Sequence, residues 1–486
     1  MNKKAELVFI PTPGAGHLVS ALELAKLLLH RQHQLSITVL IMRLFPDSKV
    51  NAYLDSFSAV NRINFVRLPN NELPIPGSNP RSFFTSFIES QKPHVKEIVS
   101  KLVHSESACS DSPRLAGLVL DMFCAAMIDV ADELGVPSYI FYTSSAACLG
   151  LMFHAQALYD EQNKHTAELK DSDDELELPG LVNPIPAKVL PFAFLDKDWS
   201  VIAFEQARGF RRSKGIVVNS FIELESNMIK SLSKSETNLP PVYPVGPILN
   251  LEGDSTQHGS GGSATNAEIM EWLDDQLPSS VVFLCFGSRG SFGKDQVKEI
   301  AFALEQSGHP FLWSLRQPPP KGQFAIPSDY INFTEVLPEG FLDRTAGIGK
   351  VIGWAPQVSI LAHKAIGGFV SHCGWNSTLE SIWSNIEVAT WPMGAEQQLN
   401  AFEMVIELGL AVEIKMDYRK DFWRENQVIV SAGEIERGIR KLMNNDNKIK
   451  NKLKEMSENS RKAMAEGGSS FTSLGCFIDD VMSNIS

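Results

Sequence analysis

The amino-acid sequence predicts an α/β protein built from two similar halves that face each other across a cleft. Three observations support this fold class. Short apolar runs alternate with amphipathic helical stretches in both halves, a Gly- and Ser-rich segment separates the halves, and 486 residues exceed what one hydrophobic core usually supports. Strands that alternate with helices imply right-handed crossovers, so each half is expected to contain a parallel sheet.

The first half, residues 1–247, opens with a buried strand followed by a glycine turn. After that turn, leucine and alanine recur at spacings of four and three from Leu18 to Leu29, which predicts one apolar face of a helix. Strands are predicted at residues 7–10, 37–41, 115–120, 138–142 and 215–218. This alternation predicts a first α/β domain.

A linker separates this domain from a second α/β half, residues 267–463. From residue 248 to 266 the composition shifts to Gly, Ser, Asp and Thr, which predicts a flexible connection. Strands are predicted at residues 281–286, 311–315, 367–370 and 388–390, and helices at 295–307 and 432–443. Three consecutive prolines near the start of residues 317–336 predict a long surface loop.

The charge balance and the lack of long apolar segments exclude several functions. Lys and Arg number 44 against 57 Asp and Glu, a net charge of −13, whereas nucleic-acid binding usually needs a basic face. No stretch of about 18 uncharged apolar residues is present, so no membrane span is expected. The N-terminal apolar run is too short for a signal peptide, and the six cysteines lack paired spacing. We therefore predict a cytoplasmic protein with buried thiols.

Residues 354–397 carry the most informative pattern in the chain. Trp354 offers a flat face for a base, and the apolar strand at 367–370 leads into residues 374–377, which open a helix. Free backbone N–H groups and the positive dipole end at that helix start would hold phosphates. Glu380 follows one turn later, and an acid-amide pair able to bond vicinal hydroxyls ends the window. This order suits a nucleotide diphosphate that carries a sugar.

The window closely resembles the signature box of plant family 1 UDP-glycosyltransferases, which begins W-A-P-Q, contains H-C-G-W-N-S and ends E-Q. The likeness extends to F-I-P-T-P-G-A-G-H, G-L-V-L-D and V-F-L-C-F-G-S, so it covers nearly the whole chain. It implies the GT-B fold, in which two Rossmann-like domains face across a cleft and the last helix, here residues 464–486, packs back on the first domain. It also implies a UDP-dependent hexosyltransferase with UDP-glucose as co-substrate and no cofactor. The fold needs no partner to complete its cleft, so a monomer is expected, although the sequence leaves the oligomeric state open.

The resemblance further implies which residues bind the donor. They are Ser288, Trp354, Ala355, Gln357, His372, Gly374, Trp375, Asn376, Ser377, Glu380, Glu396, Gln397 and, from the first domain, Thr143. Trp354 and Gln357 match positions that read uracil. Trp375, Glu396 and Gln397 match sugar-contacting positions, and a terminal Gln goes with glucose in the family.

Several of these assignments have structural alternatives that the sequence leaves open. Ser288, assigned to the phosphates, also suits a plain turn. Ser377, assigned to the diphosphate, and Glu380, assigned to the ribose, form an S-x-x-E pattern that is also a capping box. Trp354 could belong to the core, and Thr143, assigned to the sugar, could simply end a strand.

His17 is the candidate base for the acceptor proton. It follows two glycines at a strand-to-helix turn, near the carboxyl end of the first strand, where open α/β sheets bind ligands. A helix N-terminus disfavours an imidazolium, so the ring is expected to be neutral, and Asp121 at another strand end can orient it. A His after a glycine turn is more often structural, but the resemblance assigns the catalytic pair to His17 and Asp121.

The expected reaction is a single displacement in which the acceptor oxygen attacks the anomeric carbon opposite UDP, so an α-linked donor gives a β-glucoside. His372, Asn376 and Ser377 would bond the diphosphate more strongly as negative charge moves onto it. No metal is expected, because no Asp-x-Asp cluster lies near the phosphate loop. NAD is not expected either, because the dinucleotide pattern from Gly14 lacks its third glycine at Val19.

Apolar side chains in the first-domain loops predict a hydrophobic acceptor. The candidates are Phe84, Phe87, Met122, Phe123 and Phe192, with Gly394 from the second domain. Related sequences often carry an aromatic residue at Gly394, so its absence is expected to widen the pocket. Apolar rings around a few polar groups suit a flat or polycyclic alcohol, and the chain is similar to the branch acting on phenols, flavonoids and triterpenoids. For Phe87, packing in the core is an equal alternative.

Two other functions would use the same donor site. One is a UDP-sugar hydrolase or epimerase, and the other is a UDP-sugar-binding protein without acceptor transfer. An epimerase would need NAD, and the intact pair of His17 and Asp121 argues against a binding protein. A second departure from the family box, Glu387 in place of a proline, is expected to loosen a turn and removes no donor contact.

Overall fold

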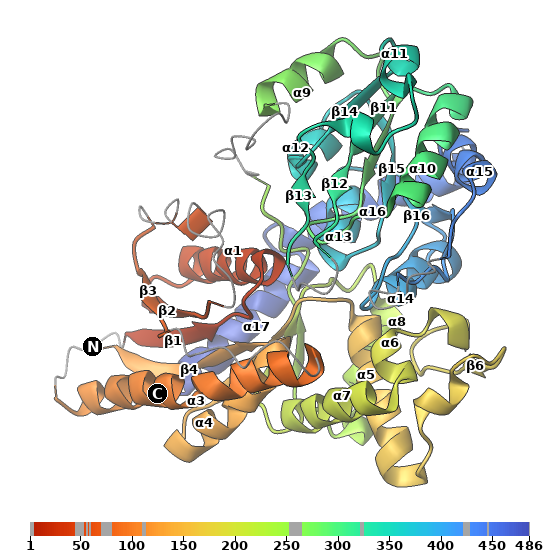
Figure 1. Ribbon diagram of the computed structural model, residues 1–486. Coiled ribbons are helices and arrows are strands. Elements are labelled where there is room, and N and C mark those ends of the chain that lie inside the picture. Colours follow the sequence, from red (N-terminus) through yellow and green to blue (C-terminus); the bar gives the residue numbers. More distant parts are fainter. Residues whose placement is uncertain are drawn as a thin grey trace.

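The computed structural model forms two α/β domains that are joined by a linker (Figure 1). It describes residues 4–43, 53–54, 57, 60–69, 80–108, 113–251, 265–320, 325–420, 428–444 and 447–485. The Gly- and Ser-rich centre of the predicted linker lies outside these ranges. None of the helices within them is both long and apolar enough to cross a membrane.

The first domain contains a seven-stranded parallel sheet in the order β3-β2-β1-β4-β5-β8-β9. Its strands are β1 (Ala5–Ile10), β2 (Leu35–Ile41), β3 (Ile63–Arg67), β4 (Arg114–Asp121), β5 (Ser138–Tyr142), β8 (Gly215–Val218) and β9 (Val242–Pro244). Its helices include α1 (Ala15–Arg31), α3 (Pro80–Ala108), α4 (Ile128–Leu134), α5 (Ala146–Gln162), α6 (Phe192–Leu195), α7 (Lys197–Phe210) and α8 (Ser226–Leu232). The central strands are buried along their length because helices cover both faces of the sheet.

The second domain contains a six-stranded parallel sheet in the order β14-β11-β10-β15-β16-β17. Its strands are β10 (Val281–Cys285), β11 (Phe311–Ser314), β14 (Gly349–Ile352), β15 (Ile366–Ser371), β16 (Val388–Thr390) and β17 (Ala411–Glu413). Its helices include α9 (Asn266–Asp274), α10 (Lys294–Ser307), α11 (Phe341–Thr345), α12 (Gln357–Leu361), α13 (Trp375–Trp383), α14 (Gln397–Phe402), the π-helix η7 (Glu403–Glu407), α15 (Ala432–Met443) and α16 (Asn447–Met464). The predicted alternation of strands and helices is confirmed in both halves.

The predicted surface loop at residues 317–336 contains a short strand pair, and residues 321–324 of the loop lie outside the described residues. Two short strands, β12 (Arg316–Gln317) and β13 (Ser328–Asp329), pair antiparallel at its base. An ion pair of 2.9 Å between Arg316 and Asp329 holds them together. Local composition cannot reveal such a pair, because its members lie far apart in the sequence.

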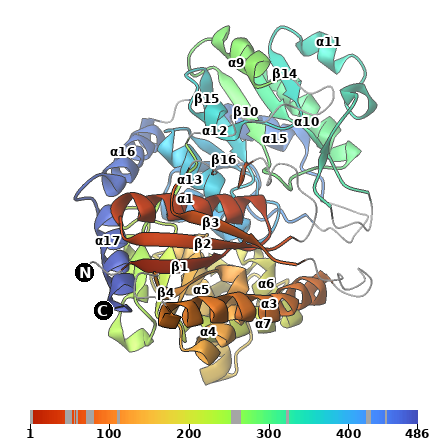
Figure 2. The same ribbon diagram turned by 90° about the vertical axis from the view of Figure 1, so that its left-hand side faces the viewer.

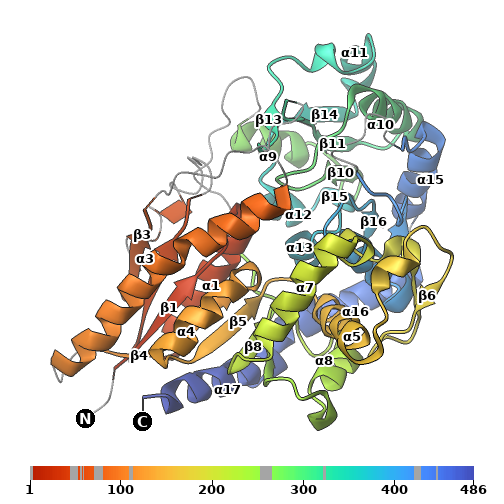
Figure 3. The same ribbon diagram turned by 60° about the horizontal axis from the view of Figure 1, so that its bottom comes forward.

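The last helix, α17 (Ser469–Ser483), returns to the first domain as predicted (Figure 2, Figure 3). The ring of Phe477 lies in the core of that domain, with its centroid 5.1 Å from that of Tyr139. The Asp480 carboxylate accepts a hydrogen bond of 2.8 Å from the Tyr139 hydroxyl and pairs with Lys214 at 3.0 Å. The chain therefore crosses between the domains through the linker and again before α17.

Candidate active site

His17 and Asp121 lie side by side at the carboxyl edge of the first sheet. Because β1 and β4 are adjacent parallel strands, the turn after β1 and the last residue of β4 meet at one edge. Gly14 caps α1, and His17 falls in the first turn of that helix. Its Nδ1 lies 2.8 Å from a carboxylate oxygen of Asp121, which leaves Nε2 as the nitrogen that can act on a substrate.

The Asp121 carboxylate is fixed by Thr12, a residue that the sequence analysis missed. The Thr12 hydroxyl and the Phe123 backbone N–H both donate to the carboxylate oxygen that does not face His17. Asp121 is only 2% exposed, so these bonds hold a buried charge in one orientation. In the sequence, Thr12 is visible only as a hydroxyl between two prolines, which by itself signals no function.

Thr143 joins this pair. Its hydroxyl lies just beyond β5, 3.1 Å from Nδ1 of His17, and donates to the Met122 sulfur at 3.6 Å. The Phe123 ring packs edge-on against the His17 ring, with centroids 5.4 Å apart. The sequence prediction assigns Thr143 to the sugar, whereas the structure places its hydroxyl on the imidazole, where it supports the ring.

Opposing influences act on the pKa of His17. Burial lowers the pKa, the charge and hydrogen bond of Asp121 raise it, the charge of Glu396 raises it, and the charge of Arg289 lowers it. The net pKa lies above the ordinary value of 6.5, so the carboxylate at 2.8 Å outweighs the helix end that was expected to keep the ring neutral. The ring can therefore accept a proton fully only above this raised pKa.

In the second domain, His372 lies between two glycines. A Cβ atom on either Gly287, which has φ +72°, or Gly374, which caps α13, would lie 2.5 Å from Nε2 of His372. Burial lowers the pKa of His372 to about 4, so the ring is neutral near pH 7. Its buried Nδ1 has no hydrogen-bond partner among the described residues, which fits a site for a ligand oxygen. Ser288 follows Gly287 and is exposed beside it.

The start of α13 connects the two domains. Gly374, the N-cap of this helix, makes no side-chain cap, and the backbone N–H of Trp375 bonds to Glu396. The N–H groups of the next two residues, Asn376 and Ser377, are therefore the ones at the helix start that suit a ligand. The Asn376 amide donates to the Ser20 hydroxyl on α1 at 3.3 Å, while its carbonyl oxygen is buried without a partner in the described part of the chain. The helix that carries His17 thus touches the helix start that suits a diphosphate.

Gln357 binds two of the other predicted donor residues. Its amide nitrogen donates to the Ser377 hydroxyl at 2.7 Å and to the Glu380 carboxylate at 2.6 Å. Burial raises the pKa of Glu380 to about 7, against the bond from Gln357, which lowers it. The capping-box interpretation of Ser377 and Glu380 is wrong, because Gly374 is the N-cap of α13 and Ser377 lies inside the helix.

Trp354 has a cationic neighbour that the sequence analysis missed. The Arg316 guanidinium lies 5.1 Å from the centroid of the Trp354 ring, and the pair with Asp329 holds the guanidinium in place. The Trp354 side chain is half-buried, and Ala355 beside it is buried. This arrangement restricts the Trp354 ring at the position that matches the uracil reader.

The predicted sugar-contacting residues differ in what they can reach. Trp375 is 3% exposed, and its indole N–H donates to the carbonyl of Asn219 in the first domain at 2.6 Å, so its side chain holds the domain interface. The Gln397 side-chain oxygen accepts from the backbone N–H groups of Met393 and Gly394 at 2.8 and 3.1 Å. That contact fixes the loop before α14. The Trp375 indole therefore belongs to the domain interface, and the assignment of Trp375 to the sugar stays a prediction.

Glu396 is the partly buried acid of the same loop. Burial raises its pKa, while backbone hydrogen bonds, including one from Trp375, the charge of His17 and a bond from Asn400 lower it. The net pKa is above the ordinary value. Glu396 and His17 therefore influence each other's pKa although they belong to different domains.

The candidate acceptor residues separate into two groups. Phe84 and Phe123 pack edge-on with centroids 6.0 Å apart, so an aromatic row leads from α3 to His17. Phe87 is 2% exposed and packs in the core of the first domain, so its assignment to the acceptor is wrong. Met122 is half-buried, and Phe192 is exposed. A Cβ atom on Gly394 would meet no atom within 4 Å, so there is open space beside residues 393–397.

Comparison with known proteins assigns the chain to a family. The family described as UDP-glucoronosyl and UDP-glucosyl transferase matches residues 220–452. A UDP-glucose flavonoid 3-O-glucosyltransferase of Fragaria ananassa is 55% identical, over 100% of this chain and 100% of that protein. The chain belongs to this transferase family.

Solved structures agree with this assignment. A transferase of Siraitia grosvenorii in complex with UDP matches with a TM-score of 0.86 and 52% identity, over 99% of this chain and 100% of that chain. A Medicago truncatula transferase complexed with UDP-glucose matches with a TM-score of 0.85 and 42% identity, over 99% of each chain. The predicted GT-B fold and the predicted enzyme class, a plant UDP-glycosyltransferase, are confirmed.

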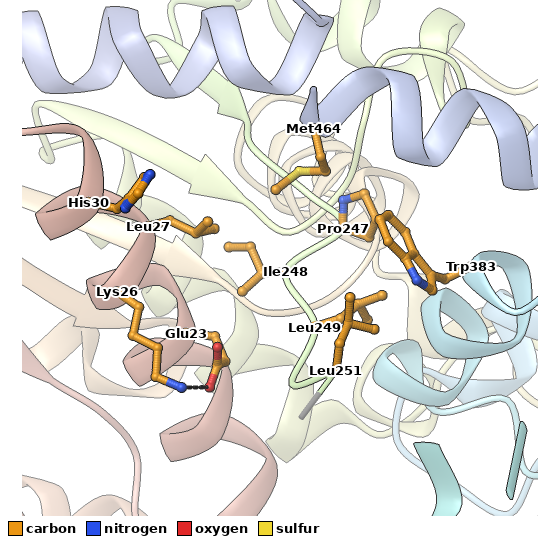
Figure 4. Close-up of a pocket in the computed structure, with 10 residues that line it drawn as sticks. All are labelled: Glu23, Lys26, Leu27, His30, Pro247, Ile248, Leu249, Leu251, Trp383 and Met464. Atoms are coloured by element: carbon orange, nitrogen blue, oxygen red, sulfur yellow. Dashed lines mark hydrogen bonds and ion pairs between the residues drawn. The ribbon is translucent and has the colours of Figure 1, made fainter. Parts of the chain in front are cut away.

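A cavity of about 410 Å³ lies at the domain junction of the transferase (Figure 4). It is lined by Glu23, Lys26, Leu27, His30, Pro247, Ile248, Leu249, Leu251, Trp383 and Met464. These residues come from the later turns of α1, the linker and the ends of α13 and α16, and none of them belongs to the predicted site. Among the described residues, no group of three or more His, Cys, Asp or Glu side chains is placed to hold a metal ion.

The departure from the family box lies in the turn between α13 and β16 of the transferase. Asn385 adopts φ +57°, and Glu387 is buried. The Phe369 N–H on β15 donates to the Glu387 carbonyl at 2.9 Å, so the turn remains attached to the sheet. None of the predicted donor residues lies in this turn.

Proposed function

We propose that this transferase moves glucose from UDP-glucose to a hydroxyl group of a hydrophobic plant small molecule, a phenolic, flavonoid or terpenoid. The observation that carries the proposal is the pairing of His17 with Asp121 opposite the open start of α13, with Ser20 and Asn376 in contact across the cleft at 3.3 Å. The names of the Fragaria relative and of the Medicago complex support the same donor and acceptor class.

The second domain binds the donor in this proposal. The neutral His372 ring, the Ser288 hydroxyl and the N–H groups of Asn376 and Ser377 at the start of α13 bind the diphosphate through hydrogen bonds. Trp354 stacks on uracil. Glu380, whose pKa burial raises to about 7, bonds the ribose hydroxyls as an acceptor or, when protonated, as a donor.

The first domain carries out the proton transfer. The acceptor O–H gives its proton to Nε2 of His17 while its oxygen forms a bond to C1 of glucose. The bond between C1 and the UDP oxygen breaks, and UDP leaves with its electron pair from the opposite face, so the configuration inverts. Asp121 stabilises the imidazolium, and the groups at the start of α13 stabilise the departing charge.

The acceptor lies against the aromatic row formed by Phe84 and Phe123. Their rings lead to His17, and the open space beside Gly394 leaves room for a bulky or polycyclic body next to the sugar. Met122 lines the same edge through its contact with Thr143. An apolar surface beside one polar pair suits a flat hydrophobic alcohol.

The compartment and oligomeric state are further parts of the proposal. Asn376 begins an Asn-Ser-Thr glycosylation sequon inside the proposed phosphate site, where a glycan would block the donor, so we place the enzyme in the cytoplasm. Both domains of one chain complete the site, so the enzyme works as a monomer. The displacement involves no change of redox state and requires no cofactor.

A UDP-sugar hydrolase or a non-catalytic UDP-sugar-binding protein is the alternative, and one experiment separates the three. The protein is incubated with UDP-glucose and a panel of plant phenolics, flavonoids and triterpenoids, and the products are read by mass spectrometry. The proposal requires the gain of one hexose on at least one acceptor. Free glucose without a glucoside would indicate hydrolysis, and an unchanged donor would indicate binding alone.

A further inference from the structure

Residues 416–420, which follow β17, contact three segments of the proposed site. They are termed the strap here. Its partners are the phosphate loop (residues 287–291, after β10), the sugar loop (residues 393–397) and the acceptor segment (residues 190–195 of the first domain), which contains Phe192. The strap therefore contacts both the predicted donor loops and the segment that contains the predicted acceptor residue Phe192.

Lys420 connects the phosphate loop to the sugar loop. Its backbone N–H donates to the carbonyl of Met393 at 2.8 Å. Its ammonium group donates to the hydroxyl of Ser291 at 3.2 Å and also to the carbonyl of that residue. Because Ser291 is buried, a shift of either loop would leave a desolvated polar group without its partner.

Arg419 connects the strap to the acceptor segment. Its guanidinium donates to the buried carbonyl of Leu190 in the first domain at 2.6 Å, two residues before Phe192. This is a direct hydrogen bond from the second domain to the segment of the first domain that contains the predicted acceptor residue Phe192. The position of the acceptor segment is thereby coupled to that of the donor domain.

The strap itself is held firmly in the second domain by Tyr418. The carbonyl of Tyr418 accepts a hydrogen bond of 2.8 Å from the amide of Gln398 on α14. Its ring packs edge-on against Trp391, with centroids 5.9 Å apart, and lies 6.5 Å from Phe292. Arg419 and Lys420 thus follow a residue that is fixed in the second domain, and Lys420 contacts loops of that domain while Arg419 contacts the first domain.

We propose that the strap sets the relative position of donor and acceptor, with Lys420 positioning the phosphate and sugar loops and Arg419 positioning the acceptor segment. Both are positioning residues, because they act through the loops and not on the reacting atoms. This inference rests on the proposed function, since it takes those loops to be the donor site.

The test compares Lys420→Met and Arg419→Met with Lys454→Met as the control. Lys454 is an exposed lysine on α16, outside the strap and the proposed site. The measurements are the Kd for UDP by calorimetry, the KM values for UDP-glucose and for quercetin (or for the best acceptor of the panel if quercetin is not turned over), and the thermal unfolding midpoint.

Each variant is expected to change a different constant. Lys420→Met should raise the Kd for UDP and the KM for UDP-glucose about fivefold, as expected for loss of a charged hydrogen bond, with the acceptor KM unchanged. Arg419→Met should raise the acceptor KM by a similar factor and leave the Kd for UDP unchanged. Lys420→Arg should recover most of the UDP affinity, because a guanidinium can donate to the same two oxygens of Ser291. Lys454→Met should match the wild type.

Two outcomes would overturn the inference. The first is a Kd for UDP in Lys420→Met that stays within twofold of the wild-type value. The second is that Lys420→Met and Arg419→Met each raise the KM for UDP-glucose and the KM for the acceptor equally, and that Lys420→Arg does not recover UDP affinity. Gln357→Ala separates this failure from a failure of the proposed function. If Gln357→Ala weakens UDP binding and Lys420→Met does not, only the role proposed for the strap is wrong. If neither variant weakens UDP binding, the proposed donor site and the role proposed for the strap are both wrong.

Discussion

Asp121 holds His17 through one carboxylate oxygen, while Thr12 and the Phe123 N–H hold the other. The carboxylate therefore cannot rotate away, and the ring presents Nε2 to the acceptor in a fixed orientation. This matters because a base must lie within hydrogen-bond distance of the proton it removes. At the residue scale, the same pair also sets the pH at which the base works.

The pH dependence of the reaction is a first prediction. His17 acts in its neutral form, and its pKa is raised because burial, which lowers it, is outweighed mainly by Asp121. The acid limb of kcat/KM should therefore have a midpoint above 6.5, with activity lost as the pH falls through it. In Asp121→Asn the raising charge is gone, so the residual activity should show a lower midpoint. A pH profile that is identical in both enzymes would contradict this assignment.

The glycines around His372 give a second prediction at the residue scale. A Cβ atom on Gly374 would lie 2.5 Å from Nε2 of His372, although its backbone dihedrals suit any residue. Gly374→Ala should displace the ring and weaken UDP binding about tenfold or more, a loss of about 1.4 kcal/mol, as measured by calorimetry. In Gly293→Ala, the added Cβ meets no atom within 4 Å, so that variant should bind UDP as the wild type does. Equal affinities in the two variants would contradict the proposed phosphate site.

At the scale of elements, two buried carboxyl groups meet where α8 and η7 join the domains. Glu225 accepts from the Ala146 and Ala147 N–H groups at the start of α5, at 2.9 and 2.6 Å. Glu403, 2% exposed, shares a hydrogen bond with Glu225. Burial and the charge of Glu225 raise the pKa of Glu403 well above its ordinary value, with a further contribution from Glu407. The pair is therefore satisfied when Glu403 is protonated.

This pair predicts a pH-dependent stability. The pKa of Glu403 is higher in the folded protein than in the unfolded chain. Its contribution to the free energy of unfolding is therefore complete below the ordinary carboxyl pKa and is lost as the pH rises through the pKa of the folded state. Glu403→Gln keeps a neutral hydrogen-bonding group, so its free energy of unfolding relative to wild type should rise from pH 5 to pH 9. Chemical denaturation at both pH values checks this. Glu458→Gln, at an exposed position on α16, is the control, and parallel pH curves for Glu403→Gln and wild type would refute the prediction.

At the scale of the whole molecule, hydrogen bonds between distant residues fix the two domains. Trp375 donates to the Asn219 carbonyl at 2.6 Å, and the Ser145 hydroxyl lies 3.3 Å from the Asn400 side chain. The Glu407 carboxylate accepts from the side-chain amide of Asn183 at 2.8 Å. These contacts surround the cleft, so the facing positions of base and phosphate site result from the domain interface as a whole.

The sequence predicts the parts of the fold that local pattern encodes. Strand ends fall within two residues of prediction at β4 and β10, because apolar runs between turn residues mark buried parallel strands. The sequence does not predict the features that depend on contacts between residues far apart in the chain. Phe87 is apolar in any environment, and only the packing of α3 shows that it belongs to the core. The role of the Trp375 indole in the domain interface is likewise not visible in the sequence, because its partner, the Asn219 carbonyl, lies 156 residues away.

The most direct measurement of the central claim compares His17→Ala with wild type in two assays on the same preparation. The claim is that the second domain binds the donor while His17 from the first removes the acceptor proton. The variant should lose about 10³-fold or more in kcat for glucoside formation, the size expected for a general base, while its Kd for UDP by calorimetry stays within twofold. Turnover near wild type, or loss of UDP binding together with activity, would contradict it.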